Sequence, residues 1–186
     1  MSCRPLQPHE YLSVEERAAI AEIEATTDIL RLVTRLTRLR FAAIAKFTES
    51  EWITCHVHDP EHLGIQTSER IPLEITLCSE FRKDPGALLV PRISRDARFA
   101  SRPVVRMFDL ESYAGVPIFL PDGRLYGALC ALDSEAASFD NPDLGETLGL
   151  FARLVGCIFF ASLSTWPETE PHEADAVPAA AHSHSS

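Results

Sequence analysis

The apolar residues near the start of the chain follow the spacing of one helix face. Within residues 13–39 the recurring apolar positions are Ile20, Ile23, Leu30, Val33 and Leu36. Ser13 and Glu16 match a capping box, in which each side chain bonds the backbone N–H of the other residue. We therefore predict one helix over residues 13–39. Because that is long for a small domain, part of it is expected to project and pair with a second copy of the chain.

After this helix, the spacing of the apolar residues changes to the alternation that is typical of β-strands. Phe41–Thr48 is mostly apolar, and Glu51–His58 alternates between polar and apolar residues. The alternation predicts two faces for the second strand, with Trp52, Thr54, His56 and His58 on one and Ile53, Cys55 and Val57 on the other. The polar residues 59–70 predict a loop.

Short elements are predicted for the middle of the chain. A short helix is expected over Glu74–Lys83, because Pro85-Gly86 follows as a helix-ending pair. Leu88–Val90 predicts a buried strand. Ser94–Phe108 is polar and predicts a loop with a helical turn.

The last third predicts a hairpin and a helix. Two apolar runs within residues 111–133 flank Pro121-Asp122-Gly123, whose residues suit a tight reversal. Asn141-Pro142 supplies a helix cap and a proline at the first helical position. We predict a helix from there to about Ser162, with an apolar stripe of Leu144, Leu148, Phe151, Val155, Ile158 and Phe159.

Strands joined by tight turns indicate an antiparallel sheet in an α+β fold. The first and last helices are expected to cover one face of the sheet, and the short helices and loops the other. We predict a leader over residues 1–12, a domain over residues 13–163 and a tail over residues 164–186. The tail is expected to be disordered, because it contains several prolines and no periodicity.

Composition narrows the range of functions. The 186 residues are 46% hydrophobic and 24% charged, as in ordinary soluble domains, and a net charge of −10 argues against a nucleic-acid partner. No segment is expected to approach the ~20 apolar residues of a membrane span, and no signal peptide is expected. We therefore predict a cytoplasmic protein without membrane contact. The five cysteines form no Cys-x-x-Cys pair and are expected to be reduced.

The hairpin resembles the C-terminal strand pair of the GAF domain family. The matching positions are Tyr113, Gly115, Val116, Pro117, Ile118, Asp122, Gly123, Gly127, Leu129 and Asp133. Residues 77–90 and 95–100 are similar to further family elements in the same order. The likeness is greatest to GAF modules of bacterial histidine kinases and cyclic-dinucleotide signalling proteins. The resemblance implies an antiparallel sheet of five to six strands.

Several functions of the family are not supported by the residues present. Leu144 stands where cyclic-nucleotide-binding members carry glutamate, so cAMP or cGMP is not expected. Bilin-binding members use a Cys-His pair before the hairpin, whereas the only one here is Cys55-His56, far upstream. Methionine-sulfoxide-reducing members have a cysteine near Cys78, but they also need one before the hairpin, and residues 94–113 contain none.

The resemblance implies a ligand pocket between the sheet and the short helices. Residues that could line it are Cys78, Phe81, Arg98, Phe99, Val104, Met107, Phe108 and Tyr113, with Arg106 or Asp109 as further polar anchors. The alternative is that these side chains fill the core and leave no cavity. Cys78 and Cys130 are candidates for a redox sensor, with inert burial as the alternative. His56 and His58 form only a weak metal-binding pattern, and no metal, catalytic residue or named cofactor is predicted.

These features predict a stand-alone GAF-type sensory domain without catalytic activity. It is expected to bind a small molecule, a separate signalling protein or both, for example in a two-component system. The first and last helices are predicted to form a homodimer through Leu32, Leu36, Leu39, Leu150, Leu154 and Ile158. The alternatives are a bilin photosensor, a thiol-dependent methionine sulfoxide reductase and a purely structural dimerisation module without a ligand.

Overall fold

The computed structural model describes residues 13–164. Helix α1 (Val14–Thr37) begins at the predicted capping box, where Ser13 Oγ accepts the N–H of Glu16 and the Glu16 carboxylate accepts the N–H of Ser13. The predicted leader and residues 165–186 of the predicted tail lie outside the described residues. Ser164, which we assigned to the tail, is instead the last residue of helix α3 (Leu144–Ser164).

Six strands form one antiparallel sheet in the order β3-β2-β1-β6-β5-β4, which confirms the predicted fold class. The strands are β1 (Phe41–Phe47), β2 (Glu51–His58), β3 (Arg70–Pro72), β4 (Leu88–Val90), β5 (Ser112–Phe119) and β6 (Leu125–Asp133). β3 lies where we predicted only a loop and the approach to a helix. At three residues it is too short to show an alternating pattern.

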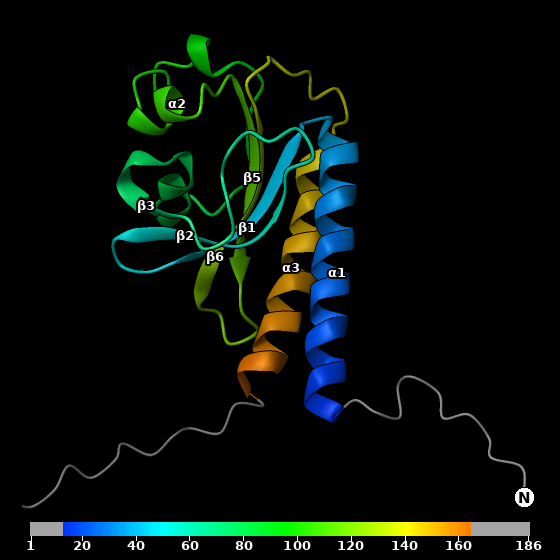
Figure 1. The fold of residues 1–186 in the computed structure, drawn as a ribbon. Helices are drawn as coiled ribbons and strands as arrows, with labels where there is room; N and C mark the ends of the chain where they lie inside the picture. The colour runs from blue at the N-terminus through cyan, green and yellow to red at the C-terminus, as the bar shows by residue number, and fades with distance from the viewer. Residues whose placement is uncertain (1–12, 165–186) are drawn as a thin grey trace, which may run out of the picture.

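Helices α1 and α3 cover one face of the sheet and run antiparallel to each other (Figure 1). The other face carries the short elements η2 (Leu73–Ile75), η3 (Leu77–Arg82), η4 (Ile93–Arg95) and α2 (Pro103–Met107). This two-sided arrangement is the predicted one. The helix predicted over residues 74–83 is instead a pair of 3₁₀ segments, separated where Thr76 is extended and its hydroxyl donates to the Leu73 carbonyl.

A β-bulge changes the predicted faces of β2. The register with β1 shifts between Ile44 and Ala45, so that Ile44 pairs with His56 while Ala45 pairs with Thr54. Trp52 consequently lies in the core beneath the short elements, whereas His56 stacks on a phenylalanine of α3. The prediction that Trp52 and His56 share a face is therefore wrong, because an extra residue in a strand inverts the alternation beyond it.

The turn between β5 and β6 forms as predicted. The N–H of Gly123 donates to the Leu120 carbonyl at 2.8 Å, and Gly123 has a φ of +86°, which glycine adopts without strain. The start of α3 differs, since the Asn141 side chain accepts the N–H of Asp143 and closes a separate turn. The helix therefore begins at Leu144 rather than at the proline after Asn141.

Only the second half of α1 packs on the sheet. Its buried residues are Thr26, Ile29, Leu30, Val33 and Thr37. Ile20, Ile23 and Leu36 of the predicted stripe are 43%, 54% and 41% exposed. Contrary to our sequence prediction, Leu144–Ser162 is long and apolar enough to cross a membrane by length and composition alone, although one side of this helix packs on the sheet.

Candidate functional site

The core beneath the short elements contains a small cavity. Its volume is about 20 Å³, roughly the space that one water molecule needs. Its walls are Trp52, Ile65, Ile71, Thr76, Leu77, Cys78, Val104, Leu110, Tyr113, Cys130 and Leu132. Typical small-molecule pockets measure roughly 300–1,000 Å³, so the ligand of such a cavity must be small or the pocket must open.

The pairing of β5 with β6 positions two polar groups of the wall. Tyr113 and Gly115 are alternate residues of β5 and therefore share a face, and Gly115 pairs with Cys130 of β6. A Cβ at Gly115 would lie 2.3 Å from the Tyr113 hydroxyl. The absent side chain thus leaves space for the phenol, whose oxygen lies 3.1 Å from Cys78 Sγ.

Electrostatics distinguishes the two thiols of the cavity. Burial raises the pKa of the Cys78 thiol, but contacts with Cys130, Tyr113 and the Trp52 N–H outweigh burial, so this pKa lies below its ordinary value. The contact with Cys78 and burial raise the pKa of Cys130 well above its ordinary value. Burial likewise raises the pKa of Tyr113. These neighbours therefore favour a thiolate at Cys78 over one at Cys130.

Arg102 holds η3 in place at the cavity. Its guanidinium donates to the Thr76 carbonyl at 2.5 Å and to the Ser79 hydroxyl at 2.6 Å, and it pairs with Glu80. Its side chain is 17% exposed and lies over the Phe99 ring. This anchor could not be predicted from the sequence, because several arginines occur in the same segment and only the fold distinguishes them.

Arg102→Ala should loosen η3. The variant loses hydrogen bonds from a charged donor and leaves the Glu80 carboxylate without this partner, so we expect the free energy of unfolding to fall by roughly 2 kcal/mol. Urea denaturation measures the change, with Arg98→Ala as the control. Arg98 is 67% exposed and pairs with Asp96, so its loss should cost less than about 1 kcal/mol. Equal losses in the two variants would contradict the anchoring role.

The structure places the predicted pocket residues in three groups. Cys78, Val104 and Tyr113 line the cavity. Phe81 and Phe99 are buried in the surrounding core, and Phe108 packs against that core while half-buried. Met107 is 57% exposed, and Arg98, Arg106 and Asp109 are exposed as well, so these four lie away from the cavity. Most of the aromatic cluster thus fills the core.

The remaining sequence candidates lie on the helix face of the sheet. Cys55 Sγ is 3.6 Å from the Tyr126 hydroxyl, and His56 stacks on Phe159. Burial lowers the pKa of His56. Across residues 13–164 there is no group of three His, Cys, Asp or Glu side chains that could hold a metal ion.

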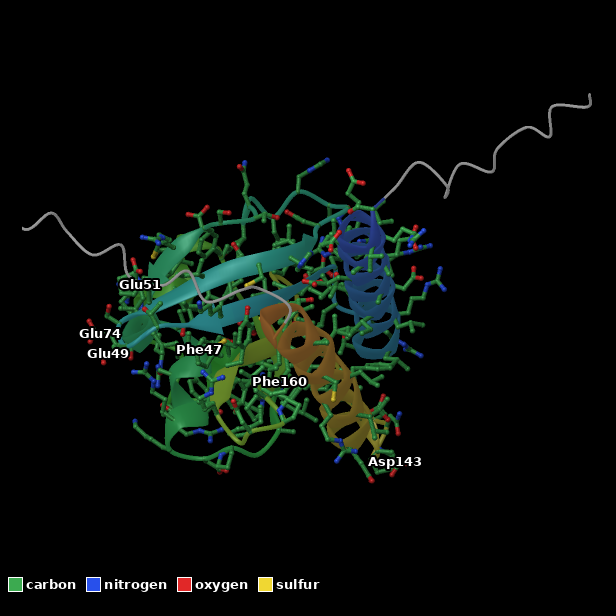
Figure 2. All side chains as sticks on the ribbon, turned by 90° about the horizontal axis from the view of Figure 1, so that it is seen from below. Phe47, Glu49, Glu51, Glu74, Asp143 and Phe160 are labelled. Carbon is green, nitrogen blue, oxygen red and sulfur yellow. The ribbon has the colours of Figure 1, made fainter. Side chains whose placement is uncertain are left out.

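A second hollow, of about 590 Å³, opens at the β2–β3 edge and is lined mostly by charged residues. Figure 2 shows Glu49, Glu51 and Glu74 gathered there, at the end of the sheet away from α1. Arg82 donates to the Glu49 carbonyl at 2.8 Å, and Arg70 pairs with Glu51. Charges of both signs that pair with each other favour no single class of ligand.

Comparisons with known proteins agree on one fold. The sequence profile of the GAF domain family matches residues 22–158. The chain is similar to the blue-light absorbing form of the PixJ GAF domain of Thermosynechococcus elongatus, with a TM-score of 0.60 and 11% identity over 82% of this chain and 95% of that one. It is also similar to a far-red cyanobacteriochrome photoreceptor, with a TM-score of 0.61 and 13% identity over 79% of this chain and 90% of that one.

A third similar structure is an enzyme, the free methionine-R-sulfoxide reductase from Neisseria meningitidis in complex with its substrate. Its TM-score is 0.56, with 21% identity over 81% of this chain and 86% of that one. No curated protein matches the chain. At such identities the structural likeness shows the fold alone.

Proposed function

This chain belongs to the GAF domain family, as the residues of its hairpin predicted, and we propose that it is a sensory domain that regulates a signalling partner without catalysis of its own. The observation that carries the proposal is the two-sided architecture (Figure 1). A cavity lies on one face of the sheet, and a helix pair with solvent-exposed leucines lies on the other. β5 and β6 contribute side chains to both layers, so these two strands link the cavity to the helices.

The proposed output surface is a homodimer contact formed by α1 and α3. Leu32, Leu36, Leu150 and Leu154 are 42%, 41%, 46% and 54% exposed. Leucines on two adjacent helices favour packing against a second copy as a four-helix bundle. Leu39, which we predicted for this surface, is only 3% exposed. It belongs to the core between α1 and β1 and cannot contribute.

The proposed setting is a bacterial cytoplasm and a two-component or similar pathway, on the basis of the family likeness described above. The bilin alternative gains no support from a cavity of about 20 Å³, and the Cys55-His56 pair lies on the other face of the sheet. The reductase alternative lacks a cysteine within residues 94–113.

Leu154→Glu should convert a dimer into a monomer. A carboxylate buried in a helix bundle without a partner should weaken association by about a hundredfold or more. Native mass spectrometry of freshly purified protein measures this, and a matched denatured spectrum reveals any ligand that is lost on unfolding. Met107→Glu is the control, because Met107 is equally exposed but lies on α2, across the sheet. A monomeric wild type, or a dimer that survives Leu154→Glu, would overturn the proposed contact.

A further inference from the structure

Two cysteines that are distant in sequence share the wall of the cavity. Cys78 reaches it from η3 and Cys130 from the centre of β6, so both thiols border the same small cavity. Their exposed fractions are 3% and 1%. Buried thiols are usually inert, but two further features of this cavity distinguish the pair from ordinary core residues.

The first feature is the indole N–H of Trp52. Trp52 is 3% exposed and lines the cavity, and its Nε1 has no hydrogen-bond partner of normal geometry among the described residues. A buried donor without a partner is unfavourable, and a phenylalanine ring would avoid that penalty. Because Trp52 and Cys78 line the same cavity, an anion or an oxygen atom held there can accept this N–H.

The second feature is the number of donors around one sulfur. The Tyr113 hydroxyl lies 3.1 Å from Cys78 Sγ, and Cys130 and Trp52 line the same small cavity. A reactive thiol needs its thiolate to be stabilised, and these three groups can do so without a nearby cation. The cavity, at about 20 Å³, leaves space for a molecule little larger than water.

We propose that this cavity receives hydrogen peroxide and that the Cys78–Cys130 pair then closes into a reversible disulfide. The Cys78 thiolate attacks one peroxide oxygen, the O–O bond breaks, and the departing oxygen takes up a proton and leaves as water. Cys78 is then a sulfenic acid. The Cys130 thiol attacks its sulfur, and the hydroxyl group leaves with the Cys130 proton as a second water. The two thiols lose two electrons in total, and the peroxide is reduced to two waters.

The disulfide would tie η3 to the centre of the sheet. β6 lies between β1 and β5, and its residues Leu129 and Ala131 pack on the helix side. A covalent bond at Cys130 would thus restrain β6, the strand on which the proposed output helices pack. Reversible disulfides are typical of redox sensors in reducing compartments. The inference names the ligand class of the proposed sensory site and rests on that function.

Treatment of the full chain with hydrogen peroxide tests the inference. In a Cys3→Ser, Cys157→Ser background, free thiols are alkylated after denaturation and the peptides are mapped by mass spectrometry. We expect a linked Cys78–Cys130 peptide pair that a dithiol reductant separates. In the same background Cys130→Ser should stop at the Cys78 sulfenic acid, which dimedone captures. Cys55 should stay reduced and serves as the internal control, because it contacts Tyr126 on the other face and no thiol within residues 13–164 is hydrogen-bonded to it.

Matched substitutions distinguish a reactive site from a cavity that holds only water. Trp52→Phe and Tyr113→Phe should each slow the loss of the Cys78 thiol about tenfold, the factor expected for one hydrogen bond to a charged group. Tyr126→Phe should leave the rate unchanged, and circular dichroism checks the fold of each variant. A Cys78 that reacts only in denaturant, or that reacts at the wild-type rate in Trp52→Phe, would overturn the inference. If the thiols stay reduced while the dimer forms and another ligand binds, only the inference fails and the sensory function stands.

Discussion

Gly127→Ala should strongly destabilise the centre of the sheet. A Cβ at Gly127 would lie 1.8 Å from the Ala45 carbonyl oxygen and 2.9 Å from the Lys46 Cα, both of which are backbone atoms. Gly127 pairs with Lys46 of β1 and with Ile118 of β5, so neither neighbouring strand can retreat without breaking its own pairing. Overpacking against side chains costs about 1–3 kcal/mol. Here the added Cβ would clash with backbone atoms of a central strand, which cannot rotate away. We therefore expect the free energy of unfolding to fall by at least about 3 kcal/mol.

Chemical denaturation followed by circular dichroism measures this loss, and Gly149→Ala provides the matched control. Gly149 lies on α3, where an added Cβ meets no atom within 4 Å apart from its chain neighbours and the backbone of its own helix. The same substitution there should stabilise the protein by up to about 1 kcal/mol, since alanine favours helix more than glycine does. A Gly127→Ala protein that unfolds at the wild-type denaturant concentration would contradict the close approach of β1 and β6.

Local patterns predicted the elements that depend on neighbouring residues. The capping box at Ser13 and the turn at Pro121-Asp122-Gly123 each involve residues only a few positions apart. Both could therefore be predicted from the local sequence alone. The antiparallel order followed from such turns, and the six-stranded sheet confirms it.

Features that depend on distant partners could not be predicted in the same way. The alternation of β2 continues through Cys55 without a break, yet the pairing with β1 shifts at Ile44 and reverses the face of everything beyond it. Trp52 therefore could not be assigned to the cavity. Among the arginines of one polar segment, only the fold shows that Arg102, and not Arg98, reaches η3.

Asp133→Ala should lower the free energy of unfolding by about 3 kcal/mol. Asp133 is 4% exposed, and its carboxylate accepts Arg40 Nε at 3.0 and 2.9 Å and the backbone N–H groups of Arg40 and Glu135. Removing one partner of a buried pair costs about 3–5 kcal/mol, and the lower end applies because the Arg40 side chain is 36% exposed. Asp122→Ala is the control, since Asp122 pairs with the exposed Arg124 and should cost less than about 1 kcal/mol.

In the wild type, acidification should remove the stabilisation that the ionised Asp133 carboxylate provides. Burial raises the pKa of the Asp133 carboxyl, but Arg40 and the two backbone N–H groups outweigh burial, so the pKa lies below its ordinary value of 3.8. Because the carboxyl binds its proton more readily when unfolded, the stabilisation is complete above pH 3.8 and is lost as the pH falls through the lower pKa of the folded protein. The stability difference between the wild type and Asp133→Asn, measured by urea denaturation, should therefore shrink on acidification. A difference that stays constant would mean that the shape of the side chain, and not its charge, holds β6 to the start of β1.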